Sequence, residues 1–487
     1  MFDLLGATIP RMRAAMVTGA VSSRDLVAGY LARIAAYDRQ GPALNAISAV
    51  SASALDEAEA RDAERRAGGG AGMLHGIPVI VKDNYETREM PTSVGSAALR
   101  GWVAPGDGEI VRRLRAAGAV IIAKANMHEF AYGITTVGSL FGAARNPYGL
   151  TRNPGGSSGG TGAAIAASFA AVGLGSDTCG SIRIPAAHNS LAGIRPTQGL
   201  TSRAGIVPLS STQDIGGPMG RSVTDVAIVL DAIAGFDPAD AQTAASDGNV
   251  PRSYLDGLRL DGLRGARIGV LGALFGDDPL DRTVGAIVRG AGEAMRRLGA
   301  EVEEIVIPGL ADLLTDRMNG GLVLVHDFKF DIDAYFASRP TAPVQSLAEV
   351  LESGLFHPDV EANLRNSAAI LSRDTAEYWA HVAKRARLRE AILGVMAAHR
   401  LDAIAYPPIR RQAVLIGEAQ VGSTCRLSAN SGLPAVVVPA GFTGDGMPVG
   451  IEMLGRAWSE ARLLGLAYAF EQATRHRRAP RCVPWLG

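Results

Sequence analysis

Glycine, serine and other small residues dominate residues 155–196, the stretch that most limits what this chain can fold into. It reads GGSSGGTGAAIAASFAAVGLGSDTCGSIRIPAAHNSLAGIRP. The small residues of Ala163–Ala171 predict a closely packed helix, and a short strand follows at Val172–Gly175. We therefore expect two glycine-flanked serine loops, around Ser157 and Ser181, separated by one helix and one strand.

Short β-rich runs alternate with helical patterns from residue 76 onward. Pro78–Val81 and Val120–Ala123 are such runs, and Glu109–Ala117 between them has helical spacing. This alternation predicts an α/β sheet with covering helices. The chain has 487 residues, and large α/β enzymes of this length often form a single domain.

We divide this single domain into four parts. Residues 1–75 are expected to form N-terminal helices, and residues 76–236 the catalytic core. Residues 237–400 are richer in charge and predict a variable helical elaboration, a candidate wall for a substrate pocket. Residues 401–487 predict the last core strands and a closing helix. In the last two parts, strands are expected at Arg267–Leu271, Val302–Ile307, Ala403–Tyr406, Ala435–Val438 and Val449–Leu454.

Composition excludes several classes of partner. The formal net charge is zero, so nothing favours binding to nucleic acid or to an anionic membrane. No apolar run reaches the length of a transmembrane helix, and the N-terminus lacks the basic start and apolar run of a signal peptide. We therefore expect a cytoplasmic protein.

The cysteines and histidines predict no metal centre. An odd and sparse set of three cysteines, at positions 179, 425 and 482, argues against a disulfide framework. Neither residue type has the spacing of a metal site, and we expect no cofactor.

The loop around Ser181 follows a strand and precedes a helix. Gly180 permits a tight turn in which consecutive backbone N–H groups converge on one point. Such donors form an oxyanion hole, and a serine at the turn is placed to attack a carbonyl. A serine N-cap of the following helix is the alternative, and on this loop alone both stay open. The expected donors are the N–H groups of Thr178, Cys179, Gly180 and Ser181.

Ser157 lies among four glycines at positions 155–160, which permit a strained or cis peptide bond. A flexible loop and a phosphate cradle are alternatives, but the lysine of a P-loop is missing. The sequence also fits the G-x-S-x-G elbow of esterases, although residues 146–154 before it read as a loop and not as the required strand. Ser158, beside Ser157, is expected to have a supporting role.

Lys82 ends an apolar run in GIPVIVKDN. Burial disfavours the charged form of lysine and lowers its pKa. A neutral Lys82 could take a proton from Ser157, which could in turn take one from Ser181. The alternative is a simple ion pair with the neighbouring Asp83. Asp177 and Arg183, which flank the Ser181 turn, are expected to pair and to hold that loop.

Together these sites resemble the amidase signature family. The resemblance rests on GGSSGG, GSDTCGSIRIPAA and GIRPT, and on GIPVIVKDN and AKANMHEFA upstream of them. The C-terminal segments GLPAVVVPAGF and MPVGIEMLG are also similar to the family. The resemblance covers nearly the whole chain and is weakest over residues 237–400.

The resemblance implies one α/β domain with a large mixed, twisted sheet between helices. It places the family's lysine on Lys82, its bridging serine with a cis peptide on Ser157, and its acylated serine on Ser181. The implied chemistry is acyl transfer from a small-molecule amide to Ser181, release of amine or ammonia, and hydrolysis by water, without a cofactor. A homodimer is left open.

This sequence departs from the family at two positions. Cys179 stands where the family usually has glycine, and His188 where an aromatic residue is common. We expect a changed pocket shape. Cys179 would be a rival nucleophile if its thiolate were stabilised.

The family contains more than one kind of enzyme. The glutaminase subunit of tRNA-dependent amidotransferases typically has glutamine after the GSIR arginine, where this chain has Ile184. The segments SSTQDIGGPMGRSVTD and LVHDFKFDIDAYFA are more similar to the peptide-amidase and aryl-amidase branch. We therefore expect a free-standing amidase. The amidotransferase glutaminase, an esterase or urethanase, and a binding protein on an inactive hydrolase scaffold remain alternatives.

Overall fold

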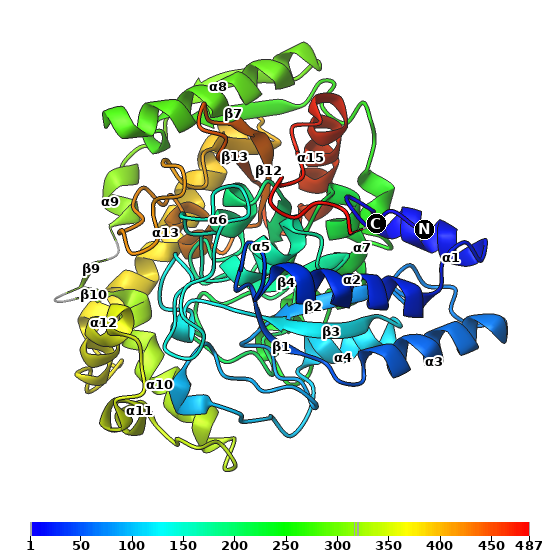
Figure 1. Cartoon of the computed structure of the whole chain (residues 1–487). Helices are drawn as coiled ribbons and strands as arrows, with labels where there is room; N and C mark the ends of the chain where they lie inside the picture. The colour runs from blue at the N-terminus through cyan, green and yellow to red at the C-terminus, as the bar shows by residue number, and fades with distance from the viewer. Residues whose placement is uncertain (1, 316, 319–320, 487) are drawn as a thin grey trace.

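A mixed sheet of 11 strands runs through the molecule, with helices packed around it (Figure 1). The computed structural model describes residues 2–315, 317–318 and 321–486. The strand order is β1-β3-β2-β4-β6-β5-β12-β13-β11-β7-β8. Strand β2 runs parallel to both β3 and β4, whereas β12 and β13 in the middle of the sheet are antiparallel. The single α/β domain with a large mixed sheet is therefore confirmed.

The strands of this sheet are short. They are β1 Ile47–Val50, β2 Pro78–Lys82, β3 Val120–Ala125, β4 Val172–Ser176, β5 Ala192–Arg195, β6 Gly216–Gly220, β7 Arg267–Leu271, β8 Glu301–Ile305, β11 Ala403–Tyr406, β12 Ala435–Phe442 and β13 Pro448–Leu454. A separate two-stranded sheet consists of β9 Arg317–Met318 and β10 Gly321–Leu322.

The helices connect and cover these strands. They are α1 Ile9–Val17, α2 Ser23–Tyr37, α3 Ala54–Arg66, α4 Glu109–Ala116, α5 Gly159–Ala166, α6 Arg183–His188, α7 Val223–Ile233, α8 Arg282–Arg297, α9 Leu310–Leu314, α10 Val323–Ala337, α11 Leu347–Ser353, α12 Pro358–Ala368, α13 Ala376–Ala398, α14 Arg426–Ser431 and α15 Glu460–Thr474. Among the described residues, no helix has both the length and the apolar character needed to cross a membrane.

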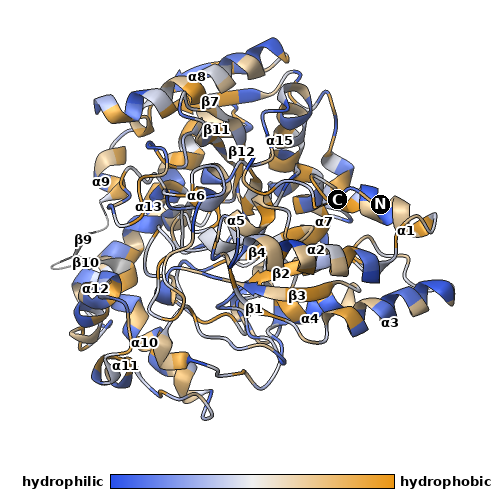
Figure 2. Cartoon of the chain, viewed as in Figure 1, coloured by the Kyte–Doolittle hydropathy of each residue, from blue (hydrophilic) through white to orange (hydrophobic). Residues whose placement is uncertain are grey.

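The central strands form the core because their side chains are buried on both faces. Every residue of β2, β3 and β4 is buried, which is typical of strands in a covered sheet. Figure 2 shows apolar colours on these strands and polar stretches on outer helices such as α3. The carboxyl ends of β2 and β4 carry Lys82 and the Ser181 loop.

Several elements differ from the sequence-based expectation. Residues 1–75 contain β1 besides helices, and β1 pairs antiparallel with β3. Strand β6 was missed because its sequence, GGPMG, has no β-rich run. Helix α5 lies at Gly159–Ala166, earlier than the expected Ala163–Ala171. A Cβ on its Gly160 would clash with the carbonyl of Asn126. Close packing thus explains the small residues of this helix.

The segment 237–400 has two roles. Its strands β7 and β8 extend the main sheet, as parallel neighbours beyond β11. Its helices α10–α12 build a second apolar cluster, in which Phe328 of α10 packs edge-on against Phe130 and Tyr132. Residues 316, 319 and 320 of this segment lie outside the described part of the chain. The helices therefore cover the side of the core on which residues 130–132 lie.

Candidate active site

Lys82, the last residue of β2, is fully buried and is surrounded by hydroxyl groups. Its Nζ lies 2.7 Å from Ser157 Oγ and 2.8 Å from Ser176 Oγ. Asn84 Nδ2 also donates to Ser176 Oγ, at 3.0 Å. Within the described residues, no carboxylate forms an ion pair with Lys82. The structure therefore places Lys82 in direct contact with Ser157, as predicted.

Burial lowers the pKa of Lys82 to about 7, although the negative charges of Asp214 and Asp177 act in the opposite direction. An ordinary lysine has a pKa near 10.4 and is almost fully protonated at neutral pH. A substantial fraction of Lys82 is thus neutral near pH 7 and can accept a proton.

The alternative pairing of Lys82 with Asp83 is wrong. Successive side chains of a strand point to opposite faces, so Asp83 faces away from Lys82. It lies on the face of Lys124, the residue of β3 that is in register with Val81. Lys124 Nζ lies 3.6 Å from Asp83 Oδ1, and that pair is fully buried.

Ser157 follows a cis peptide bond from Gly156, as the family resemblance implied. The carbonyl of Ser157 accepts from the N–H of His128 at 3.0 Å. Ser158 links this loop to its surroundings, because its N–H donates to Ser181 O and its hydroxyl to Ser176 O, both at 3.2 Å. The two serine loops are thus in contact.

Ser181 lies in the turn between β4 and α6. Helix α6 has Ile182 at its N-cap without a side-chain cap, so the N-cap interpretation of Ser181 is wrong. The hydroxyl of Ser181 has no hydrogen-bond partner among the residues that the structure describes. The residues before Ser157 form no strand, and the esterase-elbow alternative therefore lacks its required context.

The turn contains fewer available N–H donors than expected. Gly180 adopts a positive φ of 89°, but its N–H donates to Asp177 Oδ1 at 2.7 Å. Because the Gly180 N–H already donates to the Asp177 carboxylate, Gly180 is not available as one of the predicted oxyanion donors. The N–H groups of Thr178, Cys179 and Ser181 have no acceptor in the described part of the chain, and remain candidate donors.

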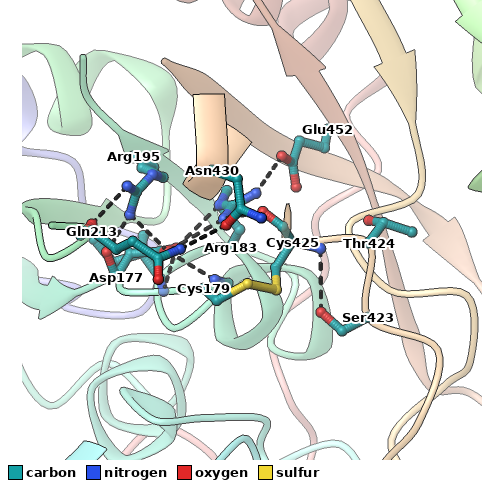
Figure 3. The surroundings of a disulfide bond; sticks show 12 residues. Asp177, Cys179, Arg183, Arg195, Gln213, Ser423, Thr424, Cys425, Asn430 and Glu452 are labelled. Atoms are coloured by element: carbon teal, nitrogen blue, oxygen red, sulfur yellow. Dashed lines mark hydrogen bonds and ion pairs between the residues drawn. A yellow bond between two sulfur atoms is a disulfide. The ribbon is translucent and has the colours of Figure 1, made fainter. Parts of the chain in front are cut away.

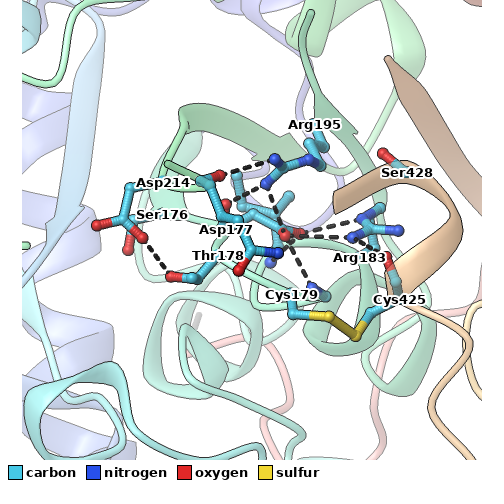
Figure 4. A network of polar contacts seen from close by, with 12 residues as sticks. Ser176, Asp177, Thr178, Cys179, Arg183, Arg195, Asp214, Cys425 and Ser428 are labelled. Carbon is cyan, nitrogen blue, oxygen red and sulfur yellow. Dashed lines mark hydrogen bonds and ion pairs between the residues drawn. A yellow bond between two sulfur atoms is a disulfide. The ribbon is translucent and has the colours of Figure 1, made fainter. Parts of the chain in front are cut away.

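A fully buried ionic cluster supports this turn (Figure 4). Arg183 Nε lies 3.1 Å from Asp177 Oδ2, which confirms the expected pair. Arg183 Nη1 also contacts Glu452 Oε1 at 2.6 Å, and Arg195 Nη1 contacts Asp177 Oδ1 at 3.1 Å. The two arginines hold the pKa of Asp177 far below its ordinary value. Arg195 and Glu452 were not predicted, although both lie within segments that resemble the family.

The opposite side of the turn is held by Asp214. Thr178 Oγ1 donates to Asp214 Oδ1 at 2.5 Å. The other oxygen of this carboxylate accepts from the N–H groups of Leu209 and Ser210 at 2.8 and 3.0 Å. Burial raises the pKa of Asp214 to about 6. The loop of residues 209–214 is thereby connected to the turn.

Cys179 forms a disulfide with Cys425 (Figure 3). The expectation that the sparse cysteines form no disulfide is therefore wrong. The two residues are 246 positions apart, but the fold brings their Cα atoms within 5.1 Å. A disulfide sulfur carries no thiolate, so Cys179 is not a rival nucleophile in this state. Cys482 is the free cysteine.

Two buried histidines lie near the serine loops. His188 Nε2 donates to the carbonyl of Arg411 at 3.2 Å, and burial lowers the pKa of His188 to about 4. Its side chain is buried. His128 was not singled out, and burial lowers its pKa to about 3. Both rings are neutral at pH 7 and neither is hydrogen-bonded to Ser181.

A family model described as Amidase matches residues 25–464. The chain belongs to the amidase family. Peptide amidase from Stenotrophomonas maltophilia has a similar structure, with a TM-score of 0.90 and 39% identity over 98% of this chain and 99% of that one. A glutamyl-tRNA(Gln) amidotransferase subunit of Moorella thermoacetica is 38% identical over 94% of this chain and 95% of its own length.

A third relative is the probable amidase At4g34880 of Arabidopsis thaliana, which is 34% identical over 99% of this chain and 93% of its own. Family membership and these relatives show that the protein is a hydrolase acting on C–N bonds of amides. For such an amidase the site contains a buried amine in contact with Ser157 and Ser176. Beside available N–H donors it also contains Ser181, whose hydroxyl has no hydrogen-bond partner among the described residues. No group of metal-ligating side chains is assembled within the described residues.

Proposed function

We propose that this amidase hydrolyses a small carboxylic acid amide through Lys82, Ser157 and Ser181, and that it acts without a partner protein. The observation that carries the proposal is the 2.7 Å contact between Lys82 Nζ and Ser157 Oγ in a site that lowers the pKa of this lysine to about 7. A buried lysine that contacts two serine hydroxyls, and no carboxylate at ion-pair distance within the described residues, is suited to act as a base.

The reaction begins with Lys82 in its neutral form. Ser181 Oγ attacks the amide carbonyl and gives its proton to Ser157, while Ser157 gives its own proton to Lys82. The oxyanion is stabilised by N–H groups of the 178–181 turn. The proton returns through Ser157 to the leaving nitrogen as the C–N bond breaks. Water then attacks the Ser181 acyl ester along the same proton path and releases the acid.

General-base catalysis of this kind contributes about 10²–10⁴ in rate, and each oxyanion donor about 10²–10³. Ser181 Oγ is the atom that attacks the carbonyl. In Ser181→Ala the backbone N–H groups of the turn remain, but no acyl ester can form, so the proposed route is lost.

Independent action is favoured by two observations. The TM-score is 0.90 with the peptide amidase but 0.75 with the glutamyl-tRNA(Gln) amidotransferase subunit of Thermotoga maritima, which is 26% identical. Ile184 also places an apolar side chain beside Gly180, where amidotransferase subunits typically have glutamine. A glutaminase subunit remains the second candidate, because curated relatives named as amidotransferase subunits are 36–38% identical over more than nine-tenths of this chain. Aryl amides, anilides, carbamates and esters are further substrates to test.

The test compares wild type with Ser181→Ala on primary carboxamides, anilides, esters and glutamine. We expect the wild type alone to hydrolyse a carboxamide, and Ser181→Ala to lose at least about 10⁴ of kcat/KM while keeping its thermal melting temperature. Wild-type activity in Ser181→Ala would overturn the proposal. Glutamine as sole substrate, together with a co-purifying partner, would support the second candidate. The cytoplasmic location and the homodimer stay predictions.

A further inference from the structure

Cys179 lies at the centre of the 178–181 turn, and its backbone is held differently from that of its neighbours. Thr178 is fixed through its hydroxyl to Asp214, and Gly180 through its N–H to Asp177. The N–H and carbonyl groups of Cys179 have no hydrogen-bond partner within the described residues. Its attachment to the rest of the protein, apart from its chain neighbours, is therefore the bond to Cys425.

Cys425, at the other end of the bond, belongs to a firmly held segment. Its carbonyl accepts from Arg183 Nη2 at 3.2 Å, and so joins it to the buried ionic cluster. The preceding Thr424 donates from Oγ1 to the carbonyl of Pro407 at 2.6 Å. In α14, Asn430 Oδ1 accepts from Gln213 Nε2 at 2.8 Å. The disulfide thus joins Cys179, whose backbone lacks hydrogen bonds within the described residues, to a segment that several hydrogen bonds hold (Figure 3).

We propose that the Cys179–Cys425 disulfide is a positioning element for the oxyanion-binding turn, so that its reduction slows acylation of Ser181. The inference rests on the proposed function, because it assumes that Ser181 is the nucleophile. The Cys179 N–H can stabilise the oxyanion if its direction is already fixed before the substrate reacts. Donors that are preorganised in this way need no rearrangement during the reaction. A displacement of about 1 Å in such a site costs up to about 10² in rate.

A dithiol can reduce the Cys179–Cys425 disulfide. One thiolate of the dithiol attacks the sulfur of Cys179, which is partly exposed, and the thiol of Cys425 leaves. The second thiol of the reductant then closes its own disulfide and releases Cys179. Two electrons pass from the dithiol to the protein disulfide, and the two protons of the dithiol end on Cys179 and Cys425. The product is a turn in which residue 179 is no longer cross-linked to Cys425.

The test measures the rate constant with which a fluorophosphonate labels Ser181, read as intact-protein mass, together with kcat and KM for a carboxamide. Labelling needs no knowledge of the natural substrate, and the phosphonyl oxygen also depends on the N–H donors. Wild type is measured oxidised, reduced with dithiothreitol, and reoxidised. Cys425→Ser removes the bond without altering the sequence of the 178–181 turn. Cys482→Ser is the matched control, because Cys482 is free and its Sγ contacts the carbonyl of Pro147 at 3.0 Å.

We expect reduced wild type and Cys425→Ser to label at least about tenfold more slowly than oxidised wild type, with the loss in kcat exceeding the change in KM. Reoxidation restores wild type but not Cys425→Ser, and Cys482→Ser behaves as wild type in every state. If the disulfide were purely stabilising, its loss would lower the melting temperature but leave these rates unchanged at a temperature where all the proteins are folded.

The inference is overturned if reduced wild type, with its thiols titrated as free, labels at the oxidised rate. If Cys425→Ser does not fold, the comparison of oxidised and reduced wild type carries the test alone. Failure of the proposed function looks different, because oxidised wild type would then not be labelled at Ser181 at all.

Discussion

Two fully buried lysines lie on neighbouring strands of the same sheet, and one of the two has a carboxylate partner. Lys124 on β3 has a carboxylate, Asp83, at 3.6 Å, and donates to Tyr85 O at 2.6 Å and Thr92 Oγ1 at 2.7 Å. Lys82 on β2 has hydroxyl partners at similar distances but no carboxylate in ion-pair contact within the described residues. The two sites therefore separate the effect of burial from that of a charged partner.

Burial lowers the pKa of both amines, but not equally. The pKa is about 7 for Lys82 and about 8 for Lys124, where the negative charge of Asp83 offsets part of the burial. A paired lysine holds its proton and contributes to the structure. A lysine surrounded by hydroxyl groups gives up its proton near neutral pH and can act as a base.

The largest effect is expected for the lysine without a carboxylate partner. Lys82→Met removes the base and fills a similar volume, so kcat/KM for a carboxamide should fall by at least about 10³ while the protein stays folded. Steady-state kinetics and a thermal melt check this prediction. A loss below about tenfold would mean that the Lys82 site does not supply the base.

The paired lysine should show the opposite pattern. Lys124→Met leaves Asp83 as a buried charge without its partner, which is expected to lower the free energy of unfolding by about 3–5 kcal/mol. Denaturant unfolding measures that loss, and kcat of the folded protein should stay within a few-fold of wild type. In Lys124→Met/Asp83→Asn part of the stability should return. If Lys124→Met lost most of its kcat but none of its stability, the assignment of a structural role to Lys124 would be wrong.

A smaller effect is expected from Ser176, which accepts a hydrogen bond from Lys82. In Ser176→Ala the protonated amine loses an acceptor, so its pKa should fall further below the ordinary value. The rise of kcat/KM with pH should then move to lower pH than in wild type, with a rate loss of about tenfold at most. A pH profile of both proteins checks the direction, and a move to higher pH would contradict it.

The sequence predicts the parts of the site that depend on local pattern. The apolar runs of β2 and β4 predict strands, and these strands end at Lys82 and just before the Ser181 loop. The glycines around Ser157 predict that this serine lies in a loop. The alternation of side chains along β2 could also have excluded the Lys82–Asp83 pair, since it puts Asp83 on the other face.

The rest of the site depends on contacts between distant segments. Cys425 and Glu452 reach the Ser181 turn only because β11, β12 and β13 lie in one sheet with β4. Strand β6 has a glycine-rich sequence and owes its conformation to pairing with β4. The bond that removes the Gly180 N–H from the donor set depends on side-chain geometry within the turn. Local sequence patterns do not encode these contacts.

The central claim is that Lys82 is the base that activates Ser181. It is tested most directly by the rate of fluorophosphonate labelling of Ser181 from acidic to mildly alkaline pH, in wild type and in Lys82→Met. Because the neutral amine is the active form, the wild-type rate should rise with pH around a midpoint of about 7. In Lys82→Met labelling should be slow and should lack that rise. The same rise in both proteins would contradict the assignment.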